Sequence, residues 1–288
     1  MKRTLRWFFY AAAALAAVLG LSLLGPFVAR GLIGEAIPPA EQAPEGRFEE
    51  VRPFVAAGTV RVESRQGRIA VEAWDRPEIR LEAQFEVPRY TRFAFEVDAE
   101  TGEARVFVQR LERGLFGVAR DGETGGGDSV TELILRVPAA SRVEIASAAA
   151  EIAVDGVEGE VAVDTVAGPV EIAGSPRSAV VETVVSRLHF TGSAGSVTAR
   201  SVHGPVTIEG TPAAVDVETV SGGVELVLPV DHVASWELRT HGSIETDRAP
   251  QPEEVDGEWV VETEAGGDAA TVRVVCAVAE IRLRAPGR

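Results

Sequence analysis

The middle of the chain repeats every 18 residues, and this period limits the available folds more than any other feature. Each unit carries two pairs of apolar residues in alternation, with a hydroxyl residue between the pairs. The first pairs are Val143/Ile145, Val161/Val163, Ala179/Val181, Val197/Ala199 and Val215/Val217. The second pairs are Ile152/Val154, Val170/Ile172, Leu188/Phe190, Val206/Ile208 and Val224/Leu226. The hydroxyl positions are Ser147, Thr165, Thr183, Ser201 and Thr219, and Gly156, Gly174, Gly192 and Gly210 close four of the five units.

Alternation with a period of two predicts two short strands in each unit, with corners between them. A unit of this length cannot enclose a core by itself, so successive units must stack and share one interior. We therefore predict an all-β chain: a β-solenoid, or β-helix, with 18-residue coils that advance about 4.8 Å each. Glycine at the corners supplies backbone angles that other residues resist.

The hydroxyl column has the same parity as the first apolar pair, so we expect it to point inward at a corner and bond the turning backbone. The same template recurs at residues 60–71 and 272–283, where Cys276 takes the hydroxyl position. Cys276 is therefore predicted to be a small buried core residue. A further unit containing Trp236, Leu238 and Thr240 fits with one residue deleted.

The repeat is lost between residues 72 and 137, but alternating runs continue there. They predict longer strands over Glu78–Val87, Arg92–Val97, Ala104–Arg110 and Val130–Val137. The stretch Arg113–Ser129 contains three consecutive glycines and is predicted to be a mobile loop.

The amino terminus has the pattern of a membrane-targeting segment. Lys2, Arg3 and Arg6 precede 23 uncharged residues, from Trp7 to Ala29. A membrane-spanning helix needs about 20 apolar residues, whereas the apolar part of a cleaved signal peptide is shorter. The pattern thus favours an uncleaved signal anchor over a long signal peptide, with the basic end in the cytoplasm and the rest outside, periplasmic or extracellular.

Four regions are expected from these features: residues 1–34 as the basic flank and transmembrane helix, 35–50 as a Pro-rich and acidic linker, 51–137 as an amino-terminal β region with long strands, and 138–288 as solenoid repeats with closing strands. The formal charge of −16 disfavours binding of nucleic acid. A single cysteine excludes an intramolecular disulfide and a multi-thiolate metal site.

The sequence provides no catalytic, cofactor-binding or metal-ligating set. The four histidines are His189, His203, His232 and His241. The period would place His189 beside Glu171 and Thr207 on a solvated face, with His203 and His241 at corners. The outward column of the second strand, Ala153, Glu171, His189, Thr207 and Glu225, repeats no acid pair such as a polysaccharide-cleaving enzyme would need.

The chain resembles the bacterial putative-adhesin family, whose coils read roughly V-x-V-x-T/S-x-x-G-x-I-x-V. The resemblance rests on Gly58–Val71, on Val130–Leu228 and more loosely on the carboxyl end, with Trp74-Asp75 and Leu135-Arg136-Val137-Pro138 as typical details. It implies an exported or membrane-anchored β-solenoid and supplies no catalytic residues.

We therefore expect a non-enzymatic, envelope-anchored binding or scaffolding module. It would be held in the membrane by its amino-terminal helix and would meet an envelope protein or a glycan. An accessory or sensor part of an envelope-stress system is the alternative, and a polysaccharide-acting enzyme is a further one.

Overall fold

A computed structural model describes residues 41–86, 91–110, 112–113, 119–120, 132–229, 232, 234–247, 249–263 and 269–286. Every regular element in these ranges is a β-strand, so the all-β prediction is confirmed there. No helix in these ranges is long and apolar enough to cross a membrane. The predicted transmembrane helix of residues 1–34 lies outside the described residues, as does most of the predicted loop Arg113–Ser129.

The described chain forms two compact units, divided between Pro169 and Val170. The boundary predicted at residues 137 and 138 lies inside the first of them. The amino-terminal unit holds β1 (Glu41–Gln42), β2 (Arg47–Pro53), β3 (Thr59–Trp74), β4 (Glu78–Gln84), β5 (Thr91–Asp98), β6 (Glu103–Arg110), β7 (Glu112–Arg113), β8 (Ala119–Arg120), β9 (Glu132–Pro138), β10 (Arg142–Asp155) and β11 (Glu160–Ala167).

The carboxyl-terminal unit holds β12 (Val170–Gly174), β13 (Ser178–Val185), β14 (Leu188–Gly192), β15 (Ser196–His203), β16 (Val206–Gly210), β17 (Ala214–Ser221), β18 (Val224–Val227), β19 (Ala234–Thr240), β20 (Ser243–Thr246), β21 (Glu253–Val255), β22 (Glu258–Thr263), β23 (Ala270–Val278) and β24 (Glu280–Arg284).

In the amino-terminal unit, the isolated early copy of the template stacks directly on the first full repeat. Strands β3 and β10 pair in parallel with Val60 opposite Val143 and Ile69 opposite Ile152. The residues between them form a separate layer: β6 and β9 pair in parallel with β3, whereas β5 and β4 return antiparallel. The longer strands predicted from the alternating runs are thus confirmed, and the loss of the repeat marks this inserted layer.

Aromatic side chains close the core at the inserted layer. Phe93 lies between the rings of Phe48 and Phe85, with centroid distances of 4.9 and 5.1 Å. Phe48 belongs to β2, which pairs antiparallel with β4. Residues 41–50 therefore contribute β1 and the start of β2, where the sequence had indicated part of a spacer. The prolines and acidic residues of this stretch had indicated a linker, whereas β2 packs Phe48 against the core of the unit.

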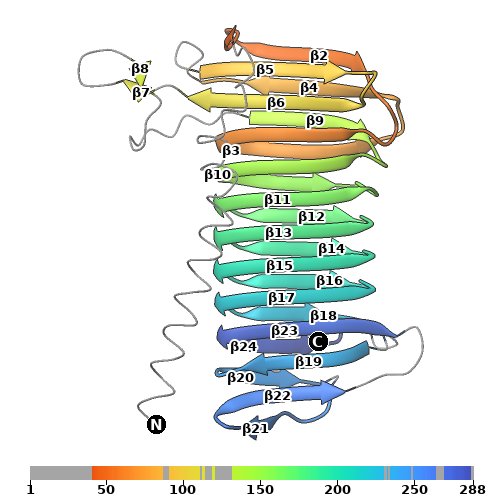
Figure 1. Cartoon of the computed structure of the whole chain (residues 1–288), viewed down its shortest axis with the longest axis vertical. Helices are drawn as coiled ribbons and strands as arrows, with labels where there is room; N and C mark the ends of the chain where they lie inside the picture. Colours follow the sequence, from red (N-terminus) through yellow and green to blue (C-terminus); the bar gives the residue numbers. More distant parts are fainter. Residues whose placement is uncertain are drawn as a thin grey trace. The chain divides into compact units, whose positions relative to one another are not determined.

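In the carboxyl-terminal unit, strands one period apart pair in parallel and in register (Figure 1). Val197 lies opposite Val215, and Leu188 opposite Val206, as the 18-residue period predicts. One ladder contains β13, β15 and β17, and the other contains β12, β14, β16 and β18. The inward residues of both ladders are buried: Phe190 and Ile208 in one ladder, and Ala179 and Val217 in the other, have no exposed surface.

The last two strands do not follow this sequential order. Strand β23 pairs with β17 on one side and with β19 on the other, and β24 lies between β18 and β20 in the same way. In the stack, the carboxyl-terminal copy of the template, β23 and β24, thus lies between the last regular repeat and the irregular copy, β19 and β20, although it follows both in sequence (Figure 1). The antiparallel strand β22 then covers the edge of β19, which protects an otherwise open edge from pairing with other chains.

The hydroxyl column is buried, as predicted. Ser147 and Thr165 have no exposed surface, and Thr240 donates a hydrogen bond of 2.7 Å to the carbonyl oxygen of Ala279. Cys276 lies between Thr219 and Thr240 and is 2% exposed. Burial raises the pKa of its thiol to about 12, so it remains protonated and unreactive.

Candidate binding surface

The outward residues of one ladder in the carboxyl-terminal unit form a continuous row of alternating charges. We call this row, which runs over β13, β15, β17, β23, β19 and β22, the charged ladder. At its first end, Arg200 lies 3.0 Å from Glu182 and 3.8 Å from Glu218. These contacts arise because parallel pairing in register places position i beside position i+18, so that Arg200 lies opposite Glu182 on one side and Glu218 on the other.

Arg273 is the centre of the charged ladder. Its Nη1 donates to Asp216 at 2.8 Å and to Glu218 at 2.7 Å, and its Nε lies 3.7 Å from Glu237. The hydrogen bond to Glu218, followed by the one to Asp216, raises the pKa of the Arg273 guanidinium further above its usual range. Arg239 continues the row, at 3.3 Å from Glu237 and in contact with Glu262.

The other ladder carries the outward column that the sequence predicted. Glu171, His189, Thr207 and Glu225 lie opposite one another in successive strands, and Arg282 follows Glu225. The predicted neighbours of His189 are therefore confirmed. Its Nε2 is 3.2 Å from the hydroxyl of Thr191 and 3.6 Å from Glu209. Ala153, from the same predicted column, belongs to the amino-terminal unit and pairs with Ala70.

The other histidines are dispersed. His203 and His241 are exposed, and His203 Nδ1 lies 2.8 Å from the Ser221 hydroxyl at the next corner. His232 follows β18, and its backbone N–H donates a hydrogen bond of 3.0 Å to the carbonyl oxygen of Pro229. Among the described residues, no group of three or more His, Cys, Asp and Glu is arranged to hold a metal ion.

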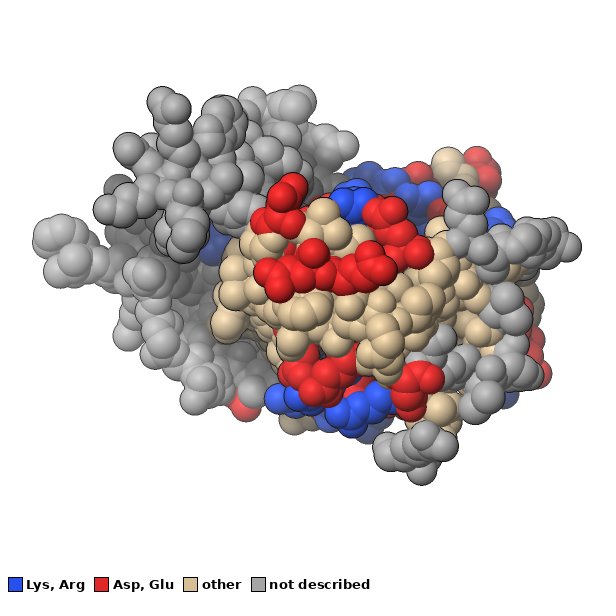
Figure 2. Space-filling view, turned by 90° about the horizontal axis from the view of Figure 1, so that it is seen from below, with Lys and Arg blue, Asp and Glu red and all other residues tan. Residues whose placement is uncertain are grey.

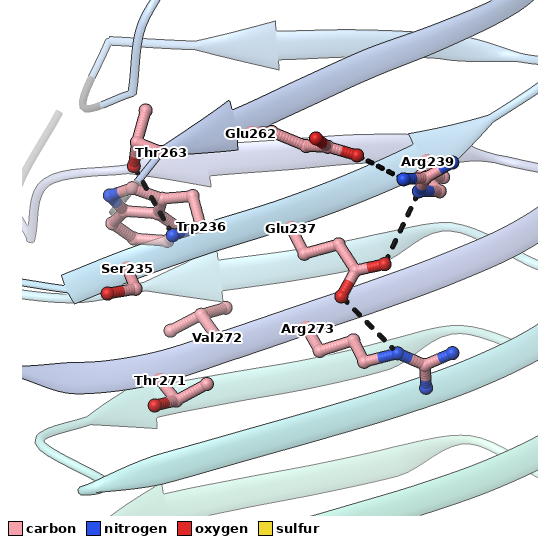
Figure 3. Close-up of a pocket in the computed structure, with 9 residues that line it drawn as sticks. All are labelled: Ser235, Trp236, Glu237, Arg239, Glu262, Thr263, Thr271, Val272 and Arg273. Atoms are coloured by element: carbon pink, nitrogen blue, oxygen red, sulfur yellow. Dashed lines mark hydrogen bonds and ion pairs between the residues drawn. The ribbon is translucent and has the colours of Figure 1, made fainter. Parts of the chain in front are cut away.

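An open depression lies on the charged ladder around β19, and we call it the β19 depression. It has a volume of about 560 Å³. Its lining comes from β19, β22 and β23: Ser235, Trp236, Glu237, Arg239, Glu262, Thr263, Thr271, Val272 and Arg273. Figure 3 shows the two arginines linked through Glu237, with Glu262 on Arg239. The charged side chains are accessible: Glu262 is 57% exposed and Arg273 is 37% exposed.

The end of the carboxyl-terminal unit beside this depression is acidic. Glu253, Glu254 and Asp256 are exposed in the hairpin of β21 and β22. Figure 2 shows acidic side chains gathered in patches on the face seen from this end, with basic side chains beside them. A partner that approaches this end of the unit therefore meets exposed carboxylates.

A buried carboxylate, Glu82, lies in the described part of the amino-terminal unit. Glu82 is 8% exposed and is contacted by Arg47, by Arg80 at 3.1 Å and by Arg136 at 3.4 Å. The hydrogen bond from Arg47 holds the pKa of Glu82 below its usual range. These side chains come from β2, β4 and β9, so the cluster joins β2 to two strands of the inserted layer.

Sequence reasoning did not find the β19 depression. It depends on β23 lying beside β19, and the two strands are separated in sequence by the hairpin of β21 and β22. The sequence did contain one indication of this site. Arg273 occupies an outward position of the last template copy, and Glu237 and Arg239 occupy outward positions of the irregular copy.

No family model and no curated protein matches this sequence. Among solved structures, the chain is similar to a putative adhesin from Bacteroides fragilis, with 10% identity, a TM-score of 0.47, and coverage of 84% of this chain and 99% of the other. A putative adhesin from Parabacteroides distasonis shares 9% identity with a TM-score of 0.45, over 83% and 98% of the two chains. A putative cell adhesion protein from Clostridium sporogenes shares 9% identity with a TM-score of 0.35, over 83% and 99%. These proteins bear the name of the family that the sequence motifs resemble. At this level of identity and TM-score, no activity, ligand or partner of theirs can be assigned to this chain.

Proposed function

We propose that the chain is an envelope-anchored β-solenoid that acts as a non-enzymatic binding or scaffolding module. Its partner, an envelope protein or a glycan, meets the outward surface of the stacked coils. The observation that carries this proposal is the surface of the carboxyl-terminal unit. Its two ladders present continuous rows of outward side chains, and the residues of the charged ladder are already paired with one another.

A polysaccharide-cleaving enzyme would need two carboxyl groups facing one scissile bond. In the outward column of the second ladder, Glu171 and Glu225 are separated by His189 and Thr207. In the charged ladder, carboxylates do come close together, but the guanidinium of Arg273 or Arg239 lies between them. Such ion pairs favour the charged form of a carboxylate, whereas a general acid needs a raised pKa.

The position outside the cytoplasm is supported by the sequence of the amino terminus, with its basic flank and 23 uncharged residues. The acidic composition supports a soluble surface beyond the membrane.

The test compares the full chain, in detergent, with a variant that keeps residues 1–40 and lacks the rest. We expect the full chain to retain its envelope partner through cross-linking and purification, and the shortened variant to lose it. Neither should cleave a panel of polysaccharides. Turnover by the full chain that disappears on replacing Glu171, His189 or Glu225 would overturn the proposal in favour of an enzyme.

A further inference from the structure

The β19 depression differs from the rest of the charged ladder because it is hollow and because charged and hydroxyl side chains line it together. Its volume of about 560 Å³ lies within the range of sites that bind small molecules. It is lined by two guanidinium groups, two carboxylates and the side chains of Ser235, Thr263 and Thr271.

We infer that the β19 depression binds a neutral oligosaccharide. This inference rests on the proposed function, because it assigns a place and a ligand class to the binding module. A sugar hydroxyl both donates and accepts hydrogen bonds, so a pair of neighbouring hydroxyls needs an acceptor beside a donor. The depression repeats that arrangement: Glu237 lies between Arg239 and Arg273, and Glu262 lies on the far side of Arg239.

The side chains that would hold the sugar are fixed in advance. Arg273 is held by Asp216 at 2.8 Å and Glu218 at 2.7 Å, both outside the depression. Arg239 is held between Glu237 and Glu262. Groups that are already ordered lose little conformational entropy when a ligand binds.

The charge balance selects a neutral ligand. The lining contains two arginines and two glutamates, and Asp216 and Glu218 stand behind Arg273. An anionic sugar would compete with carboxylates that the arginines already bind, and it would approach past the acidic hairpin of Glu253, Glu254 and Asp256. A neutral sugar keeps every ion pair and adds hydrogen bonds to their free lone pairs and protons.

The threonine methyl groups and the carbon chains of the arginines add apolar surface, which matches the C–H faces of sugar rings. A protein partner would need a much larger area than this depression, about 800 Å² on each side of a standard interface. The size of the depression therefore favours a short oligosaccharide over a protein.

The experiment measures binding of the full chain, in detergent, to neutral oligosaccharides of glucose, galactose, mannose and N-acetylglucosamine. Uronic-acid and sulfated oligosaccharides of the same length are measured beside them. We expect at least one neutral oligosaccharide to bind, with affinity little changed by added salt, and the anionic ones not to bind. Preference for an anionic oligosaccharide, or no binding of any neutral one, would overturn the inference.

Two matched pairs of variants then locate the ligand. Thr271→Phe fills the depression from an exposed position of β23, whereas Thr198→Phe adds the same ring to the charged ladder outside it. Glu262→Gln removes a carboxylate inside, and Glu182→Gln removes one that pairs with Arg200 outside. We expect Thr271→Phe to abolish binding. Glu262→Gln should weaken it about tenfold or more, the loss expected for one hydrogen bond to a charged group.

The two outside variants should bind like the parent, and all four should keep the parent's unfolding midpoint. If Thr271→Phe unfolds the chain, Glu262→Gln decides alone. Equal binding by inside and outside variants would refute the β19 depression as the site. The proposed function would still stand if the full chain retained its envelope partner in the cross-linking test. Failure of the sugar site and failure of the binding role can therefore be told apart.

Discussion

Replacing Gly204 by alanine should destabilise the chain far more than replacing another glycine of positive φ that lies at an open turn. Gly204 has a φ of +131°, and an added Cβ would lie 1.8 Å from the carbonyl oxygen of Ser186 in the preceding coil. Ordinary contact begins at 3.4 Å, so the two coils must separate by about 1.6 Å, the difference between these distances. The stacked coils cannot separate locally without weakening the ladder hydrogen bonds on either side, Ser186 N to His203 O at 3.1 Å and Gly204 N to Ser221 O at 3.2 Å.

The magnitude follows from two contributions. Backbone strain costs about 1–3 kcal/mol for a residue with a Cβ, and two weakened hydrogen bonds add about 1–3 kcal/mol. We therefore expect the free energy of unfolding to fall by about 4 kcal/mol in Gly204→Ala. Gly257 provides the control, because its φ is +84° and nothing lies within 4 Å of an added Cβ; only the strain of about 1–2 kcal/mol applies there.

Urea unfolding followed by circular dichroism measures both variants. If Gly204→Ala proves no more harmful than Gly257→Ala, the close approach of successive coils is not what requires glycine at this corner, and the reasoning is refuted.

Three further predictions use the same unfolding measurement or a chemical probe. Val206→Asp should lower the free energy of unfolding by about 3 kcal/mol or more, because it leaves an unpaired charge among aliphatic side chains, whereas the exposed Glu171→Ala should stay within about 0.5 kcal/mol; equal effects would mean that the inward and outward faces are wrongly assigned. Glu82→Gln should cost about 1 kcal/mol at pH 7, because it loses the charge-assisted hydrogen bond that Arg47 donates, and the exposed Arg47 side chain is screened by solvent. Because the folded pKa of Glu82 is lowered, the ionised carboxylate stabilises the fold above its unfolded pKa of about 4.3, and this stabilisation is lost as the pH falls through the folded pKa. The free energies of unfolding of parent and variant should therefore become equal in acid. A constant difference between them down to pH 2 would contradict this. Cys276 should react with a thiol reagent only after unfolding, as its thiol is buried with a raised pKa, and rapid labelling of the native chain would show that this coil is open.

Much of the fold could be predicted from the sequence because the period specifies the register directly. Two residues 18 positions apart must lie opposite each other if successive units stack, and this predicted the neighbours of His189. The buried place of Cys276 was predicted from the template instead, because Cys276 occupies the hydroxyl position of the copy at residues 272–283. Local alternation likewise predicted the strands of the inserted layer, although it could not assign their partners.

The order of the last coils could not be obtained in this way. The template copy at residues 272–283 matches any neighbouring coil equally well, so its register with β17 or β19 is predictable, but its place between them is not. That place depends on the antiparallel hairpin of β21 and β22, which takes the edge of β19 and leaves the other edge to β23. The β19 depression is a consequence of this order, and it was therefore missed.

Photo-cross-linking in the native envelope tests the central proposal most directly. A photoreactive residue is placed in turn at Thr198 and Thr271 on the charged ladder, at Thr207 on the other ladder, and at the exposed Thr101 of the amino-terminal unit as the control. The proposal predicts a discrete adduct with an envelope component from at least one of the three positions on the carboxyl-terminal unit and none from Thr101. Adducts from Thr101 alone, or from no position at all, would contradict a binding module that works through the outward surface of its stacked coils.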